Sequence, residues 1–295
     1  MRITDRLLVD KVLGNIQRNT QRLSDLQDEV ATGRRINKPS DDPTGTVSSL
    51  ILHSTDDENQ QDAANLDQAQ AWLNSTDVAL QDVNSILQRA RELAVQGANQ
   101  TLGPEETTSL ANEVDQLLDH AMQLANTQNG DRYIFGGFNT RTPSFNFTDS
   151  TKTAWVYNGD NGDIQRAVAP GVKLSVNVTG DRVFPGVFDV LMGIRDDLKA
   201  HNQDSLSLDR LDELDSVHND VLNALGEVGA KGARLDLTKN QLSAAHLNNK
   251  GSISDIEDAD MSDAIVNLSA QQTALQAALA TGARVIQPQL LDFLK

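Results

Sequence analysis

Both ends of this chain carry an apolar residue, or a glycine in one place, at every seventh position. The two rows are Val9, Ile16, Leu23 and Val30 near the start, and Met261, Leu268, Leu275 and Gly282 near the end. Heptad spacing keeps one stripe of a helix turned toward a partner helix. The termini of most domains are instead loosely held. We therefore predict two terminal coiled-coil helices that pair with each other and assemble with other chains.

Apolar residues flanking the heptad rows complete the predicted assembly seam. Its members are Val9, Leu13, Ile16, Leu23 and Val30 at the N-terminal end, and Ile265, Leu268, Leu275, Leu279 and Ile286 at the C-terminal end. Residues 264–283 carry no charge, but their Asn, Gln, Ser and Thr side chains are too polar for a membrane span. Such a surface is suited to burial among other protein helices.

The composition excludes several classes of function. Aromatic residues make up only 4% of the 295 residues, which favours long helices meeting along narrow seams. The net charge of −17 argues against nucleic acid, because binding to phosphates requires basic patches, and it argues against anionic membrane surfaces. The absence of cysteine excludes disulfides, thiol nucleophiles and cysteine-ligated zinc.

Hydrophobic periodicity predicts long helices on both sides of a β-rich segment. Residues 46–96 lack Gly and Pro, which permits one long helix, and a second helix is expected over 105–129. Later helices are predicted over 187–226 and 233–250, with a last one beginning at Gly251. The expected break between them is a group of glycines, Gly226, Gly229 and Gly232.

The aromatic and glycine-rich stretch 131–186 is predicted to be a compact β-rich insert. Strands are expected at 154–157, 164–168 and 172–178, with a turn over 158–163 between two of them. The fold class is therefore mainly α, with long antiparallel helices and a small inserted β domain. We predict terminal helices at 1–38 and 253–295, a helical body at 39–130 and 187–252, and the insert at 131–186.

Residues that would indicate catalysis or metal binding are scattered. The five histidines show no metal-ligand spacing, and acidic runs such as Asp56-Asp57-Glu58 are typical of solvated helix faces. The 158–163 segment lacks the ligand order of a calcium loop, and 229–234 lacks the Lys-Ser/Thr of a phosphate loop. We therefore predict neither an enzyme nor a cofactor.

Two short segments are more specific. The first follows the N-terminal helix and contains the predicted hinge residues Arg35, Ile36, Asn37, Pro39, Ser40, Asp41, Asp42 and Pro43. Gly33 should end the first helix, and Ser40 is the expected N-cap of the next, with Asp41 and Asp42 in its first turn. The second segment is Ile256-Glu-Asp-Ala-Asp260, which precedes the charge-free helix.

Together these segments resemble the flagellin superfamily. Flagellins carry a similar Arg-Ile-Asn string with a following Asp-Asp after the N-terminal helix, and Ile-Glu-Asp-Ala-Asp before the C-terminal one. Residues 87–96 are also flagellin-like, and the Lys38–Pro43 and Gly130–Asn139 strings resemble the branch that joins the flagellar hook to the filament. One departure is the doubled Gly-Ala-(Lys/Arg) at 229–234, where a single copy is expected.

The resemblance implies an extracellular structural subunit, exported through the flagellar type III channel and installed as a ring at the hook–filament junction. Implied partners are further copies of the chain, the adjacent hook-associated junction protein, filament flagellin, and an export chaperone on the C-terminal helix. It also places Arg89 and Leu93 where flagellins face an innate immune receptor. The other interpretation of that pair is a helix face buried between neighbouring subunits.

Three alternatives remain. A short filament flagellin shares the structural class and differs in polymerising indefinitely instead of stopping at a ring. A carboxylate-based, calcium-dependent hydrolase would need a metal site in the β insert that no motif predicts. A non-flagellar coiled-coil secretion or adhesion protein would leave the two specific strings unexplained.

Overall fold

The computed structural model describes the backbone of residues 2–169 and 171–292 and the side chains of 7–169 and 171–284. The chain divides into two compact units. The terminal unit contains Met1–Glu58 and Ala245–Lys295, and the central unit contains Asn59–Ala244. Two helices contribute to both units: α2 spans Pro43–Gly97 and α6 spans Leu211–Glu257.

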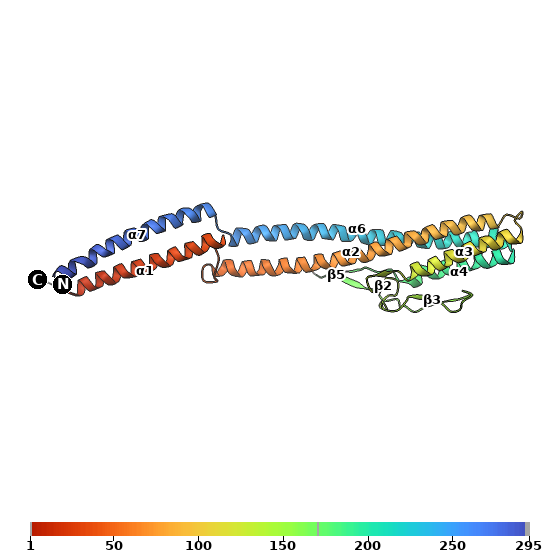
Figure 1. Cartoon of the computed structure of the whole chain (residues 1–295), viewed down its shortest axis with the longest axis horizontal. Coiled ribbons are helices and arrows are strands. Elements are labelled where there is room, and N and C mark those ends of the chain that lie inside the picture. The colour runs from red at the N-terminus through yellow and green to blue at the C-terminus, as the bar shows by residue number, and fades with distance from the viewer. Residues whose placement is uncertain (1, 170, 293–295) are drawn as a thin grey trace. The chain divides into compact units, whose positions relative to one another are not determined.

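In the terminal unit, the two end helices pair along their length. α1 (Arg2–Thr32) and α7 (Met261–Asp292) run side by side and antiparallel (Figure 1). They approach closely at Gly282, where an added Cβ atom would lie 3.2 Å from a side-chain carbon of Val12 and 3.3 Å from one of Ile16. The predicted pairing of the chain's ends is therefore present, and the heptad glycine allows the close approach.

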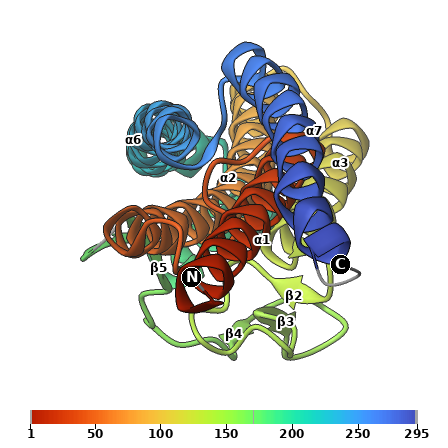
Figure 2. The same ribbon diagram turned by 90° about the vertical axis from the view of Figure 1, so that its left-hand side faces the viewer.

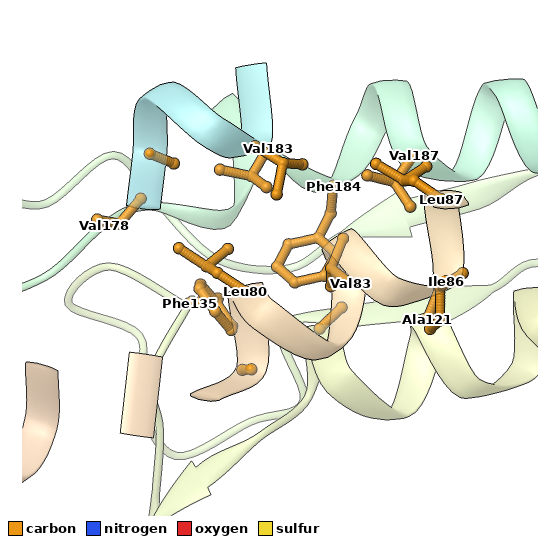
Figure 3. Packing of buried hydrophobic residues seen from close by; sticks show 14 of the residues in the cluster. Leu80, Val83, Ile86, Leu87, Ala121, Phe135, Val178, Val183, Phe184 and Val187 are labelled. Carbon is orange, nitrogen blue, oxygen red and sulfur yellow. The ribbon is translucent and has the colours of Figure 1, made fainter. Parts of the chain in front are cut away.

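Long helices also form the central unit, as predicted. α3 (Pro104–Ala125) and α4 (Phe184–Ala200) pack against each other, and the short α5 (Gln203–Ser205) follows. The α2 heptad leucines are all buried, at Leu66, Leu73, Leu80 and Leu87. Figure 3 shows Leu80, Val83 and Leu87 of α2 packed near Phe184 and Val187 of α4. These contacts form the core on which the β-rich segment lies.

The β-rich segment contains three separate two-stranded antiparallel sheets. Their strands are β1 (Gln128–Asn129), β2 (Arg132–Tyr133), β3 (Phe145–Phe147), β4 (Trp155–Tyr157), β5 (Gln165–Ala169) and β6 (Val172–Ser175). β2 to β5 lie on one side of the central unit's helices (Figure 2). Phe145 of β3 contacts Phe184 and Phe188 of α4, with ring centroids 5.5 and 5.3 Å apart. Aromatic packing therefore attaches the sheets to the helices.

The structure corrects the predicted turn over 158–163. This segment joins β4 to β5, and these strands belong to different sheets, so it is not a hairpin turn. Asp160 anchors it instead, because its Oδ1 accepts hydrogen bonds from the backbone N–H groups of Phe138, at 2.7 Å, and Gly162, at 2.8 Å. The loop is thus fastened to the neighbouring Gly-Gly-Phe loop and not to a paired strand.

The predicted helix break at Gly226, Gly229 and Gly232 is also wrong. α6 continues through all three glycines to Glu257, and the last helix begins at Met261 and not at Gly251. Buried apolar side chains on the same helix outweigh the low helix propensity of glycine, at Val221, Ala224, Val228 and Leu235. The actual interruption lies earlier, where His201 ends α4 in the left-handed conformation with φ 56°.

Two short helical turns complete the central unit. A 3₁₀ turn, η1 (Gly180–Arg182), precedes α4, and a π-helical turn, η2 (Leu206–Arg210), lies between α4 and α6.

Candidate assembly site: the linker clasp and the terminal helices

The two specific sequence strings, more than two hundred residues apart, meet in the terminal unit. The backbone N–H of Arg35 donates to the carbonyl of Glu257 at 2.6 Å, and the N–H of Ala259 donates to the carbonyl of Gly33 at 2.9 Å. Arg34 and Asp258 form an isolated antiparallel bridge. We name this arrangement the linker clasp and define it as residues 33–42 with 256–260. It joins the segment between α1 and α2 to the end of α6 and the short segment before α7.

Side chains strengthen the clasp at Arg35. Its guanidinium donates to the carbonyl of Ile256 at 2.7 Å and lies 3.4 Å from the carboxylate of Asp42. Asp42 is also the N-cap of α2, because its Oδ1 accepts from the N–H of Gly45 at 2.8 Å. That bond to Gly45 lowers the pKa of Asp42, with Arg35 contributing against the opposing effect of burial. Arg35 thus connects the start of α2 to the end of α6.

The predicted N-cap, Ser40, is not the capping residue. α2 begins at Pro43, two residues later than a Ser40 cap requires, and proline is well tolerated at a first helical position. Asp41 instead closes the preceding turn, since its Oδ2 accepts from the N–H groups of Asn37 at 3.1 Å and Lys38 at 2.8 Å. Pro39 and Ser40 are exposed in that turn, and Ile36 is half-buried.

Glu257 is the buried carboxylate at the centre of the clasp. It accepts a hydrogen bond from Ser49, lies 2.9 Å from His53 of α2, and lies 3.4 Å from Arg34. The bond from Ser49 lowers the pKa of Glu257 most, and His53 and Arg34 lower it further, against the opposing effect of burial. The sequence analysis did not identify Ser49 and His53. The only feature of the sequence that could have indicated them is the polar character of the α2 face that contacts α6.

We expect the clasp to weaken in acid. The folded-state pKa of Glu257 lies below its ordinary value of about 4.3, so its contribution to stability is complete above that pH and is lost as the pH falls through the folded pKa. Glu257→Gln should therefore lower the melting temperature at pH 7, and the difference from the parent protein should shrink below about pH 4. Asp255→Asn, at an exposed neighbouring position, is the control. Equal melting temperatures for the Glu257→Gln variant and the parent at pH 7 would contradict this assignment.

A second histidine–carboxylate pair lies beside the clasp. His246 of α6 is 2.7 Å from Asp56 of α2, and Asp56 is buried. The acidic run at 56–58 is therefore not wholly a solvated face, because its first member points toward α6. Its neighbours Asp57 and Glu58 are exposed, as expected.

The structure brings part of the predicted assembly seam together. Half-buried between α1 and α7 are Val9, Ile16, Leu23, Val30, Leu268 and Leu275. By contrast, Leu13 is 46% exposed and both Ile265 and Leu279 are 51% exposed. The side chain of Ile286 lies outside the described residues. Apart from Met261, which is 40% exposed, the heptad rows thus face the partner helix in this chain, while the described flanking positions remain uncovered.

Arg89 and Leu93 have different environments. Arg89 is exposed and pairs with Glu92, at 2.7 Å, and with Glu113, at 2.6 Å. Leu93 is only 1% exposed and lies in the core of the central unit. A buried leucine presents no surface to a receptor, so the receptor hypothesis stays a prediction that rests on Arg89 alone.

A charged network that the sequence did not reveal fastens the β3–β4 loop to the helices. Arg195 of α4 is only 1% exposed and donates to Asp196 at 2.7 Å and to the carbonyl of Lys152 at 3.1 Å. Lys152 in turn lies 2.7 Å from both Asp115 and Asp119 of α3. In the sequence, an arginine followed by two aspartates resembles a run of charges on the protein surface. In the structure, the β3–β4 loop packs over this arginine and buries it.

The described residues contain no cluster of three or more metal-ligating side chains. Over the same residues, no helix combines the length and apolar character that crossing a membrane requires.

Two family descriptions match the helical regions at the two ends of the chain. The family description "Bacterial flagellin N-terminal helical region" matches residues 7–140, and "Bacterial flagellin C-terminal helical region" matches residues 211–294. The two matches contain both halves of the linker clasp.

Individual relatives extend over nearly the whole chain. The Flagellar hook-associated protein 3 of Escherichia coli (strain K12) is 26% identical over 94% of this chain and 94% of its own length. A flagellin of Listeria innocua is 23% identical over 99% of this chain and 98% of its own length. The crystal structure of the flagellar junction protein FlgL from Legionella pneumophila superimposes with a TM-score of 0.57 over 72% of this chain and all of that one, at 15% identity, which is a likeness of fold alone. With both helical regions matched and the fold shared, the chain belongs to the bacterial flagellin family.

Proposed function

We propose that this chain is a structural subunit of the junction between the flagellar hook and filament. The observation that carries this proposal is the uncovered apolar surface of the α1–α7 pair, at Leu13, Ile265 and Leu279. Two helices alone cannot bury these side chains, and burying each contributes about 1.5–3 kcal/mol. Further helices from neighbouring copies would complete the packing, as in an inner layer of a tube.

The full-length similarity to a hook-associated protein favours the junction over other flagellar positions. On this proposal the chain is extracellular after export through the flagellar channel, has no catalytic role, and binds no cofactor. It contacts further copies of itself, an adjacent hook-associated protein and filament flagellin. Before export, a chaperone would hold the exposed stripe of α7 as a helix in a groove.

A filament flagellin is the second candidate, and the similarity to the Listeria innocua flagellin over almost the whole chain favours it. The two candidates predict different behaviour on assembly. A junction subunit stops at a ring, whereas a filament subunit continues to add copies.

Deletion of the gene distinguishes these functions. For a junction subunit, electron microscopy should show complete hooks without filaments, and unassembled flagellin should accumulate in the medium. Restoring the gene on a plasmid is the control and should restore filaments. Normal filaments after deletion would reject an essential junction role. Hooks that carry a complete junction but lack a filament would favour the filament flagellin.

A further inference from the structure

One side of α1 begins apolar and continues basic. Leu7 is 66% exposed, and the exposed Lys11 and Arg18 follow it after four and eleven residues. These spacings place the three side chains on one side of the helix, away from the heptad row that faces α7. Arg22, four residues after Arg18, is exposed on the same side. We name Leu7, Lys11, Arg18 and Arg22 the basic stripe.

The positive charge of the basic stripe is not neutralised within the chain. Over residues 7–22 the three cations stand against a single carboxylate, Asp10, which lies roughly a quarter of a turn or more around the helix from each of them. Arg18 donates to the side-chain oxygen of Asn15 at 2.6 Å, and none of the three cations pairs with a carboxylate of the described residues. The stripe is therefore available to an acidic surface.

The start of α2 carries a stripe of the opposite charge. Val47 and Ile51 are 58% and 62% exposed on the side of α2 opposite to the buried Ser49. Glu58 is exposed on the same side, and its carboxylate has no partner among the described residues. From residue 43 to residue 88, α2 contains no lysine or arginine. We name Val47, Ile51 and Glu58 the acidic stripe.

The two stripes match in spacing and in direction. From Leu7 the basic stripe continues after 4 and 11 residues, and from Val47 the acidic stripe continues after the same 4 and 11 residues. In a parallel contact, Leu7 therefore packs on Val47 in the register that brings Arg18 to Glu58. At the intermediate position the aliphatic stem of Lys11 covers Ile51 and leaves its ammonium in water. One register thus satisfies the apolar and the charged positions together.

The acidic half of another α1 would also attract the basic stripe, but it fits less well. Residues 25–29 contain three carboxylates, Asp25, Asp28 and Glu29. Asp28 already lies 3.8 Å from Lys38, and Asp25 accepts a hydrogen bond from Gln21 at 3.0 Å. Over residues 14–46 no large apolar side chain is exposed, so Leu7 would find no apolar partner there. The acidic stripe of α2 offers both kinds of contact.

We propose that the basic stripe of one copy docks in parallel on the acidic stripe of the next copy. Within one chain Leu7 and Val47 are both exposed, so the stripes do not cover each other. They consist of different residues, so the contact is head-to-tail, and its repetition generates a closed ring or a helix of subunits. The inference rests on the proposed function, because the partner is the neighbouring subunit of the same assembly.

Cysteine cross-linking tests the register of this contact, because the chain has no cysteine of its own. Leu7→Cys marks the basic stripe and Val47→Cys marks the acidic stripe. Cells that lack the gene would make the two single variants together, and their isolated flagella would be oxidised. We expect dimers that contain one copy of each variant, since the two cysteines face each other in the proposed register.

A matched control uses the residue next to Val47. Ser48 is also exposed, but it lies about 100° further around α2, so Leu7→Cys with Ser48→Cys should cross-link poorly. The Leu7–Val47 pair should give about tenfold more dimer, because docked neighbours are held at a high effective concentration. A yield no higher than that of the control overturns the proposal. Dimers from Leu7→Cys alone also overturn it, because they indicate α1 against α1.

Charge reversal tests the same contact without cysteines. Arg18→Glu places two carboxylates opposite each other and should reduce the number of filaments at least about fivefold. Glu58→Arg in the same chain should restore filaments, because each contact again joins opposite charges. Arg18→Glu with Asp57→Arg has the same net charge and is the control, since Asp57 lies on another side of α2. Equal rescue by both partners, or parental filament numbers with Arg18→Glu alone, overturns the proposal.

The two tests separate the contact from the proposed function. If the cysteine variants build normal filaments but the Leu7–Val47 pair does not cross-link, the contact is wrong and the junction role stands. If filaments form without the gene, the junction role falls, and cross-linking of the concentrated purified full-length variants then decides the contact alone. Circular dichroism of each purified variant verifies that its helices are intact.

Discussion

Leu275→Asp should abolish filament assembly. Leu275 is half-buried on α7 where that helix faces α1. It belongs to the heptad row of α7. An aspartate there would place an unpaired charge in an apolar seam, at a cost of several kcal/mol for each copy. Because every subunit carries the change, the cost repeats around the assembly. Electron microscopy of cells that make only this variant should show hooks without filaments.

Leu275→Met is the matched control for that change. It keeps the volume and apolar character of the side chain and should cost under about 1.5 kcal/mol, so filaments should form. Detection of the Leu275→Asp protein in the culture medium shows that export took place and that the failure lies in assembly. Filaments at parental numbers with Leu275→Asp would refute the seam.

Arg195→Met should destabilise the central unit by about 3 kcal/mol, because it removes one partner from a buried charge network. Arg195 is 1% exposed and donates to the carbonyls of Thr151 and Lys152 as well as to Asp196 and Asp115. Methionine fills similar space but removes the guanidinium donor from both carbonyls and from Asp196, while Asp115 keeps only its bond from Lys152. Urea unfolding followed by tryptophan fluorescence should show the loss, since Trp155 contacts Phe188 beside the network, with ring centroids 6.0 Å apart.

An exposed arginine provides the comparison. Arg91 pairs with Asp215 across the helices, but both side chains are nearly half exposed, so Arg91→Met should cost at most about 1 kcal/mol. The difference between the two variants measures what burial adds to an ion pair. If both variants unfold at the same urea concentration, the β3–β4 loop is not fastened by Arg195.

Local patterns were sufficient to predict the pairing of the chain's ends. The heptad rows at Leu23 and Leu268 and the buried leucines of α2 follow from periodicity alone, because a seven-residue spacing leaves one stripe available for packing. The two flagellin-like segments could also be recognised from the sequence alone. Their specificity came from residues such as Arg35, Asp42 and Glu257, which have no reason to recur together in an ordinary capped loop.

Local rules were less successful where packing decides. Gly226 and Gly229 looked like a break, yet α6 continues because its other face is buried at Val221 and Val228, and the free energy of that burial exceeds the helix penalty of glycine. Ser40 looked like a cap, but Asp42 caps α2 while bonded to Arg35. In both places a contact outside the local segment selects among conformations that the segment alone permits.

The amino-acid sequence by itself determined the helical class, the seams at both ends, the lack of thiol chemistry and the two specific strings. These features depend on residue type and spacing within one stretch of chain. Only the tertiary structure decided that Arg35 reaches Ile256, that Glu257 is bonded to Ser49 and His53, and that Arg195 is buried beneath a loop. Those contacts join residues far apart in sequence, and their energies arise from burial and hydrogen bonding that exist only once the helices have packed.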